Sequence, residues 1–233
     1  MIEVRDLLKT YRRGEESVLA CDVAELRLAP GEQVALMGSS GSGKSTLLHI
    51  LSGLLLPDRG HVRVGEVDVT RLGERARDRF RASHIGYIFQ TFNLLQGFSA
   101  LENVRLGAFF AGRKHAKGVA EGLLERMGLG ERLHHDPREL SVGQQQRVAV
   151  ARALINKPEL LLADEPLGNQ DPETGGKVLD LMLEIAREME STVIMVTHDP
   201  LSAEHMQRRI DLHSISAEAL GISAEDLGVG RPS

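Results

Sequence analysis

The chain has 233 residues, of which 42% are hydrophobic and 26% are charged, and its formal net charge is −5. This composition is typical of one mid-sized soluble domain and excludes a largely disordered chain. No apolar run approaches the roughly 18–20 residues that span a bilayer, and the acidic balance excludes a general, though not a local, attraction to nucleic acid. The single cysteine, Cys21, cannot form an internal disulfide, which favours a reducing compartment. We expect a cytoplasmic protein that reaches a membrane only through a partner.

Short β-rich runs alternate with helical segments along the chain, and this alternation predicts α/β layering. Residues 33–37 (QVALM) have the pattern of a buried strand and lead through a Gly/Ser loop into a helix that starts near Lys44. Gly53 is a suitable stop for that helix, because glycine adopts the left-handed conformation that often ends helices. Further strands are expected at residues 84–90, 160–163 and 192–196, which are rich in apolar and β-branched residues.

The middle of the chain has a helical pattern. Capping-box patterns at residues 99–102 and 141–144 each open a helix, and residues 117–127 form another that Gly128 closes. The helix that begins after Ser141 should stop before Pro158, because the residue before a proline disfavours the helical conformation.

This helical pattern divides the chain into a core and an inserted lobe. We expect a single domain over residues 1–228, with an α/β core at about 1–90 and 158–215 and a helical lobe at about 91–157. The pair Asp171-Pro172 predicts an N-cap and first turn for a core helix that reaches about Glu190. Residues 229–233 are expected to be a flexible tail.

Residues 38–45 (GSSGSGKS) match the phosphate-binding pattern G-x-x-x-x-G-K-[ST] completely. Glycines let successive backbone N–H groups point at phosphate oxygens, and the helix that follows directs its positive end at the same anion. A flexible turn that binds nothing is the alternative, but the flanking strand and helix disfavour it. The residues expected to bind the nucleotide are Gly38, Ser39, Ser40, Gly41, Ser42, Gly43, Lys44, Ser45 and Thr46.

Two adjacent acids, Asp164 and Glu165, end the apolar run at residues 160–163. Side chains at the end of such a strand can face the ligand edge of the sheet. Asp164 suits Mg²⁺ together with the Ser45 hydroxyl, and Glu165 suits the polarisation of a water for attack on the γ-phosphorus. Alone, the pair could be a surface turn; after a phosphate loop, a catalytic pair is the better interpretation.

Further features occur in the order found in the ATP-binding cassette (ABC) family, which the chain resembles over roughly residues 2–212. They are Tyr11, Gln90, residues 140–147 (LSVGQQQR), 168–171 (GNQD) and 197–199 (THD), which resemble the adenine-stacking aromatic, the Q-loop, the signature, the D-loop and the H-loop. The signature together with the phosphate loop is a highly specific combination.

The resemblance implies a P-loop NTPase core with a parallel sheet, an antiparallel β portion at the N-terminus and an inserted helical subdomain. It also implies a homodimer on ATP binding, in which each ATP lies between the phosphate loop of one copy and Ser141, Gly143 and Gln144 of the other. A serine-capped helix start is a suitable anion site, and a two-fold symmetric pair satisfies this geometry.

Roles for single residues also follow from the resemblance. It assigns catalysis to Glu165, His198, Gln90 and Lys44, Mg²⁺ binding to Ser45, Gln90 and Asp164, adenine stacking to Tyr11, and communication across the dimer to Asp171. Taken singly, His198 could be a structural histidine, Gln90 a surface amide and Tyr11 a core-edge residue.

The family places the groove for a membrane permease beside the Q-loop, where aromatic residues are concentrated. We expect Phe92, Leu94, Leu95 and Phe98 to line that groove, although part of this cluster must form the core of the lobe itself. The stretch FQTFNLL with ALENV is similar to ATPases of the lipoprotein-releasing and macrolide-exporter type.

The resemblance thus implies an Mg-dependent ATPase subunit of a bacterial ABC transporter or mechanotransmission complex, on the cytoplasmic face of the inner membrane and with no nucleic-acid partner. A cell-division-type cassette, a soluble ABC-type ATPase acting on DNA or ribosomes, and an inactive scaffold are the alternatives. Leu167 and Gln170 near the D-loop, Val142 in the signature and the sequence after Ile210 depart from the family pattern.

Overall fold

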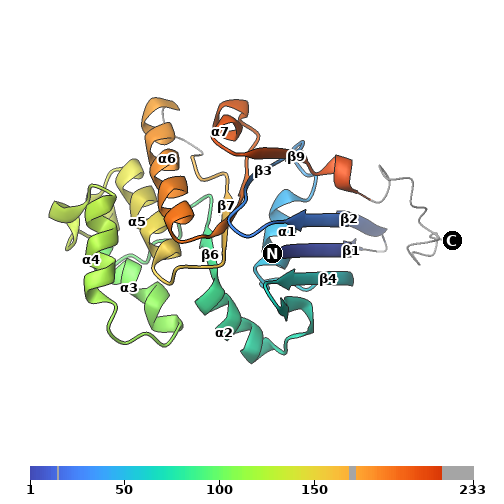
Figure 1. Cartoon of the computed structure of the whole chain (residues 1–233), viewed down its shortest axis with the longest axis horizontal. Coiled ribbons are helices and arrows are strands. Elements are labelled where there is room, and N and C mark those ends of the chain that lie inside the picture. Colours follow the sequence, from blue (N-terminus) through green and yellow to red (C-terminus); the bar gives the residue numbers. More distant parts are fainter. Residues whose placement is uncertain (15, 168–171, 217–233) are drawn as a thin grey trace.

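The computed structural model describes residues 1–14, 16–167 and 172–216, and it contains two β-sheets with helices around them (Figure 1). The antiparallel sheet has the order β2-β1-β4-β5 and consists of β1 (Ile2–Arg13), β2 (Glu16–Leu28), β4 (Arg59–Val64) and β5 (Val67–Asp68). The parallel sheet has the order β6-β7-β8-β3-β9 and consists of β3 (Gln33–Met37), β6 (Ile85–Ile88), β7 (Leu160–Asp164), β8 (Thr192–Val196) and β9 (Arg208–Asp211).

The α-helices of the described residues connect and cover these sheets. They are α1 (Lys44–Leu51), α2 (Glu74–His84), α3 (Ala100–Phe110), α4 (Lys117–Arg126), α5 (Val142–Leu154), α6 (Pro172–Glu188) and α7 (Pro200–Glu204). The α/β architecture with a parallel sheet and N-terminal antiparallel strands is confirmed. No helix in the described ranges has both the length and the apolar character needed to cross a bilayer.

The parallel sheet is buried on both faces, because alternate residues of each central strand belong to two different hydrophobic clusters. In β7, Leu161 and Ala163 pack in a cluster with α3–α6, whereas Leu160 and Leu162 pack in a cluster with α1 and the antiparallel sheet. The same alternation occurs in β3 and β8. These strands are therefore continuous apolar runs in the sequence and do not alternate with polar residues, because both faces of the sheet are buried.

The helices α3, α4 and α5 form the lobe and lie at the end of the molecule away from the antiparallel sheet (Figure 1). They share one hydrophobic cluster with α6 and with one face of the parallel sheet, so the lobe is packed on the core rather than separate from it. The division at residues 91 and 157 stays a prediction.

The helix ends lie where the capping patterns place them. Ser99 and Ser141 each complete a capping box, with Glu102 and Gln144 as reciprocal partners. Gly53 and Gly128, which follow α1 and α4, have φ angles of 69° and 69°.

The sequence analysis missed α2 and β9. The charged helix α2 has only Phe80 buried, so it presents no continuous apolar stripe. Strand β9 (RRID) is a short edge strand whose only buried residue is Ile210, and it is recognisable only through its parallel pairing with β3. The predicted N-cap Asp171 and the predicted tail at 229–233 lie outside the described residues.

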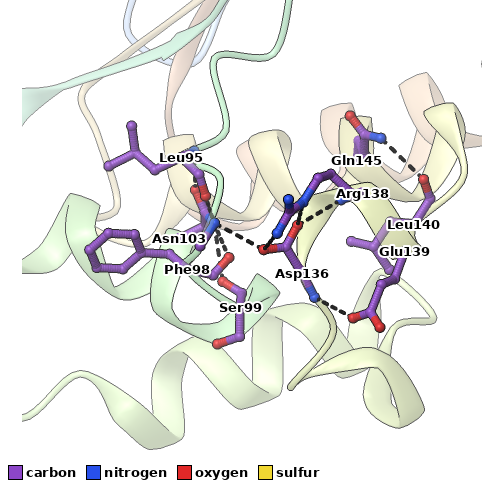
Figure 2. A network of polar contacts seen from close by, with 10 residues as sticks. Leu95, Phe98, Ser99, Asn103, Asp136, Arg138, Glu139, Leu140 and Gln145 are labelled. Carbon is purple, nitrogen blue, oxygen red and sulfur yellow. Dashed lines mark hydrogen bonds and ion pairs between the residues drawn. The ribbon is translucent and has the colours of Figure 1, made fainter.

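A polar network fixes the loop between β6 and α3 (Figure 2). The fully buried amide of Asn103 on α3 accepts a hydrogen bond from Leu95 N at 2.8 Å and donates to the carbonyls of Leu95, Phe98 and Ser99. Asp136 accepts a hydrogen bond from Gly97 N at 2.9 Å. One buried side chain therefore replaces the backbone pairing that this irregular loop lacks.

Asp136 also accepts hydrogen bonds from the side chain and backbone of Arg138, which hold the pKa of its carboxyl well below the usual range. The loop at residues 95–98 is thus anchored from two sides, by Asn103 of α3 and by the segment that precedes α5 (Figure 2).

Replacing Asn103 by leucine should lower the free energy of unfolding by about 2–4 kcal/mol, because it leaves the partly buried N–H of Leu95 and carbonyl of Phe98 without the Asn103 amide while nearly keeping the volume. Urea unfolding measures the change. The matched control is Gln96→Ala in the same exposed loop, which should stay within about 0.5 kcal/mol of the parent. Equal stability of the two variants would contradict the structural role of Asn103.

Candidate functional site

A pocket of about 690 Å³ lies at the carboxyl ends of the parallel strands. The loop after β3, the acids that end β7, the residues after β8 and Gln90 after β6 all meet there, together with residues 18–20 of β2. Neighbouring parallel strands end at the same edge of a sheet, which brings side chains that are distant in the sequence into one site. The lining residues include Ser40, Gly41, Gly43, Lys44, Ser45, Thr46, Gln90, Asp164, Glu165 and His198.

The phosphate loop has the conformation that its glycines permit. Gly38, Gly41 and Gly43 have φ angles of 154°, 79° and 94°. A Cβ on Gly43 would lie 2.1 Å from the carbonyl oxygen of Ala20, so this position admits only glycine. Lys44 Nζ donates to the carbonyls of Gly38 and Ser39 at 2.8 Å each, so its ammonium lies over the loop.

The loop residues do not all face the pocket. Ser39 and Ser42 line a second hollow, of about 290 Å³, on the Cys21 side of the loop. Ser42 Oγ is buried and has no hydrogen-bond partner among the described residues. Cys21 is itself buried, and burial raises the pKa of its thiol to about 12, so it is not a nucleophile at neutral pH.

The oxygens suited to a divalent cation lie together in the large pocket. Ser45 Oγ donates to Asp164 Oδ1 at 3.3 Å, and Gln90 lines the same pocket. Hydroxyl, carboxylate and amide oxygens are the ligands that a hard cation such as Mg²⁺ prefers. Burial raises the pKa of Asp164. A cation bound beside it would favour the ionised carboxylate, so this donor set fits Mg²⁺.

Glu165 and His198 are in direct contact, with 2.7 Å between His198 Nδ1 and Glu165 Oε1. Glu165 has a φ angle of 45°, and its N–H donates to the carbonyl of Val196 at 3.0 Å. This contact ties the turn after β7 to the end of β8. The hydrogen bond that His198 donates to the Glu165 carboxylate raises the pKa of His198, and the negative charge of Glu165 adds to the effect.

The loop that carries His198 is braced by its own polar residues. Thr197 Oγ1 accepts from Asp199 N, and Asp199 in turn caps α7 by accepting from the N–H groups of Leu201 and Ser202. These contacts fix the backbone on the C-terminal side of His198, so the imidazole is presented to Glu165 from a braced turn.

Tyr11 does not line the pocket, but its direct cross-strand partner does. Tyr11 of β1 pairs with Val18 of β2, and Val18, Leu19 and Ala20 form an apolar wall of the pocket. Side chains that are directly opposite in an antiparallel pair lie on the same face of the sheet. The sequence analysis missed this wall, because the exposure of the apolar residues Val18 and Leu19, at 46% and 57%, is visible only in the structure.

The signature residues Ser141, Gly143 and Gln144 do not line the pocket of their own chain. Ser141 Oγ accepts from Gln144 N, and Ser141 N donates to Gln144 Oε1 at 2.9 Å, so the start of α5 is capped and exposed. Gln146 in the first turns of α5 is buried and donates to the carbonyl of Pro166. The signature helix is thereby joined to the turn that follows Glu165.

The four residues expected to share one partner groove are divided by the structure. Leu95 lines a hollow of about 710 Å³ with Leu106 and Phe110, and Phe98 lines a separate hollow of about 190 Å³. Leu94 packs against the lobe core, and Phe92 lines neither hollow. Two of the four residues thus line different hollows, and the groove expected for all four stays a prediction. Asp171 and the departure at Gln170 lie outside the described residues.

Comparisons with known proteins agree on one family. A family model described as ABC transporter matches residues 21–168. The chain is 46% identical to the lipoprotein-releasing system ATP-binding protein LolD of Pseudomonas fluorescens, over 91% of this chain and 94% of the relative. It is 43% identical to LolD of Xanthomonas oryzae pv. oryzae, over 96% of this chain and 93% of the relative. Among solved structures, the dimeric ATP-binding cassette MJ0796 bound to ADP and phosphate is similar with a TM-score of 0.84 and 38% identity, over 91% of this chain and 94% of that chain.

The phosphate loop provides a paired test of the pocket. Gly43→Ala should abolish detectable nucleotide binding, because its Cβ would collide with the backbone of Ala20. Gly41→Ala is the matched control: its φ of 79° is also left-handed, but its Cβ would meet nothing within 4 Å. The control should therefore lose only about tenfold in affinity, from backbone strain of about 1–2 kcal/mol. A fluorescent ATP analogue measures both affinities, and equal losses would show that φ strain, not the close approach to Ala20, sets the requirement for glycine.

Proposed function

This chain belongs to the ABC transporter family, and on that premise we propose that it is the ATP-hydrolysing subunit of a complex that releases lipoproteins from a bacterial inner membrane. The 2.7 Å contact between Glu165 and His198, in the pocket that also holds the phosphate loop, carries the catalytic part of this proposal. The substrate class rests on the similarity to LolD, whose name states lipoprotein release. An inactive scaffold would have no need of this paired base and histidine.

Each pocket residue has a separate role in hydrolysis. Glu165 accepts a proton from the attacking water, which needs a base within hydrogen-bond reach of that water. His198 holds the Glu165 carboxylate by its imidazole and contacts the γ-phosphate. Lys44, whose ammonium lies at the loop carbonyls of Gly38 and Ser39, is placed to exchange those contacts for phosphate oxygens of higher charge. The backbone N–H groups of the loop and the N-terminus of α1 favour the same anion.

Ser45 and Asp164 would hold Mg²⁺, and Gln90, which lines the same pocket, would complete the set. When bound, the ion supplies positive charge that neutralises the phosphate oxygens during transfer. The apolar residues Val18 and Leu19 line the pocket, and Tyr11 lies beside Val18 on the same face of the sheet. This wall suits the planar adenine, because an aromatic ring and aliphatic side chains cover a base without demanding a fixed hydrogen-bond pattern.

The complete site requires two copies of the chain. Ser141, Gly143 and Gln144 form an exposed, capped helix start that lies outside the pocket of their own chain, and a helix N-terminus favours a phosphate group. We place this helix start against the ATP of the second copy. The similar cassette MJ0796 is dimeric, which supports that arrangement. Asp171 is assigned to communication between the two sites.

We assign the membrane permease to the hollow of about 710 Å³ that Leu95 and Leu106 line. Tyr87 of β6 lines this hollow, and Gln90, only three residues later, lines the nucleotide pocket. The two surfaces are thus joined by one short stretch of chain, through which closure around ATP can act on a partner. The protein would act at the cytoplasmic face of the membrane.

The variant Glu165→Gln should lower ATP turnover at least about a hundredfold while it retains ATP binding and accumulates as a dimer, because the amide cannot accept the proton. Phosphate release and size-exclusion chromatography with Mg-ATP measure the two effects. The matched control is Glu159→Gln, which alters a second Glu–His pair, 2.9 Å from His84, just before the start of the same strand. Turnover close to the parent in Glu165→Gln would exclude Glu165 as the base.

The same two variants test the electrostatics of the pair. In Glu165→Gln the pKa of His198 should fall towards the ordinary histidine value, because the carboxylate that raises it is gone. In Glu159→Gln it should not change. Titration of the histidine resonances by NMR measures it, and an unchanged His198 pKa in Glu165→Gln would contradict the contact.

The partner hollow is tested by Leu95→Glu, which should abolish capture of the chain by its permease and leave the ATPase activity of the isolated protein unchanged. Leu54→Glu is the matched control, since both leucines are 48% exposed and only Leu95 lines the hollow. Co-purification from solubilised membranes with Mg-ATP measures capture. Equal capture of both variants would move the permease surface elsewhere.

A further inference from the structure

One segment of this acidic chain carries only positive charge. From residue 103 to residue 120 there is no Asp or Glu, although the whole chain has a formal net charge of −5. The same segment contains Arg105, Arg113, Lys114, His115 and Lys117. It comprises most of α3, the connection to α4 and the first residues of α4.

The same segment exposes two adjacent aromatic rings. Phe109 and Phe110, which end α3, are 71% and 69% exposed, the highest values among the large apolar side chains of the described residues. They form an edge-to-face pair with ring centroids 5.7 Å apart. An aromatic pair at a helix end that is exposed to this extent has an energetic reason to be covered.

An aromatic side chain and three basic side chains share one surface, which we call the basic-aromatic tip and define as Arg105, Phe109, Arg113 and Lys114. Phe109, Arg105, Arg113 and Lys114 line the same shallow hollow of about 190 Å³. Its one acidic neighbour, Glu102, is engaged in the capping box, where it accepts from the backbone and hydroxyl of Ser99. Within the described ranges, the side chains of Arg113 and Lys114 have neither an ion pair nor a hydrogen bond. Lys117 has Glu121 at 3.6 Å.

We propose that the basic-aromatic tip binds anionic phospholipid headgroups at the membrane surface. Cations beside an anionic leaflet each contribute to binding, and exposed aromatic rings enter the headgroup region favourably. The small hollow favours a phosphate headgroup over a partner helix, which is about 10 Å wide. The hollow of about 710 Å³ on the other side of Leu106 remains for the permease.

Such a contact is weak alone, because stable attachment to a membrane takes two signals. The tip would supply one signal and the permease the other, so that the chain is held with its lobe against the bilayer while the dimer opens and closes. The inference does not depend on catalysis, since none of the tip residues lines the nucleotide pocket.

Sedimentation of the purified chain with vesicles tests the proposal without nucleotide or permease. We expect binding to an equal mixture of phosphatidylglycerol and phosphatidylcholine, release by salt, and much weaker binding to phosphatidylcholine alone. Arg113→Gln combined with Lys114→Gln should lower the partition coefficient about 30-fold. Phe109→Ser should weaken binding but retain its dependence on salt.

The matched control removes two cations from the antiparallel-sheet side, Arg63→Gln combined with Arg71→Gln, and should bind vesicles like the parent. All of these variants should hydrolyse ATP like the parent, which separates this test from that of the proposed catalytic function. Binding that is equal for both lipid compositions, or unchanged in the tip variants, would overturn the proposal. Tip variants that still bind vesicles but are no longer captured by the permease would also overturn the proposal, because the tip would then contact a protein.

Discussion

The constraint on which this structure depends is the burial of the parallel sheet on both faces. Each central strand supplies alternate side chains to two hydrophobic clusters, so a shift of one residue in β3, β7 or β8 would exchange the whole set between clusters of different shape. The register is therefore fixed, and with it the positions at which the strands end. Lys44, Asp164 and His198 converge because their strands end at one edge.

The turn after Glu165 links the two halves of the expected dimeric site. Glu165 adopts a left-handed backbone conformation, which for a residue other than glycine persists only where its surroundings enforce it. The hydrogen bond from its N–H to Val196 and the contact of its carboxylate with His198 hold it from β8. Gln146 holds the next residue from the signature helix. A displacement of α5 would therefore shift Pro166 and, with it, the adjacent Glu165.

The turn after Gln90 connects the nucleotide pocket, which Gln90 lines, to the hollow that Leu95 lines. Phe92 and Asn93 have φ angles of 56° and 48°, and the half-buried Arg152 of α5 donates to the carbonyls of both. Asn103 then anchors the following residues from α3. This turn lies between the nucleotide pocket and the hollow of Leu95, and its residues 92–95 are attached to the lobe. Movement of the lobe would therefore displace the turn, which gives a physical basis for coupling the nucleotide pocket to a membrane partner.

Local patterns in the sequence determined the phosphate loop, the acid pair, the capped helix starts and four of the parallel strands, because each depends on residues that are neighbours in the chain. The order of these motifs also indicated the family, and the comparisons confirmed it. Only the tertiary structure decided which side chains meet: that Val18 and Leu19 wall the pocket, that Ser39 and Ser42 face away from it, and that Leu94 is core while Leu95 faces a hollow. The short edge strand β9 and the charged helix α2 also required it. The physical reason is that a side chain's direction at a strand end or in a turn depends on backbone angles and on packing against segments far away in the sequence, which no local pattern contains.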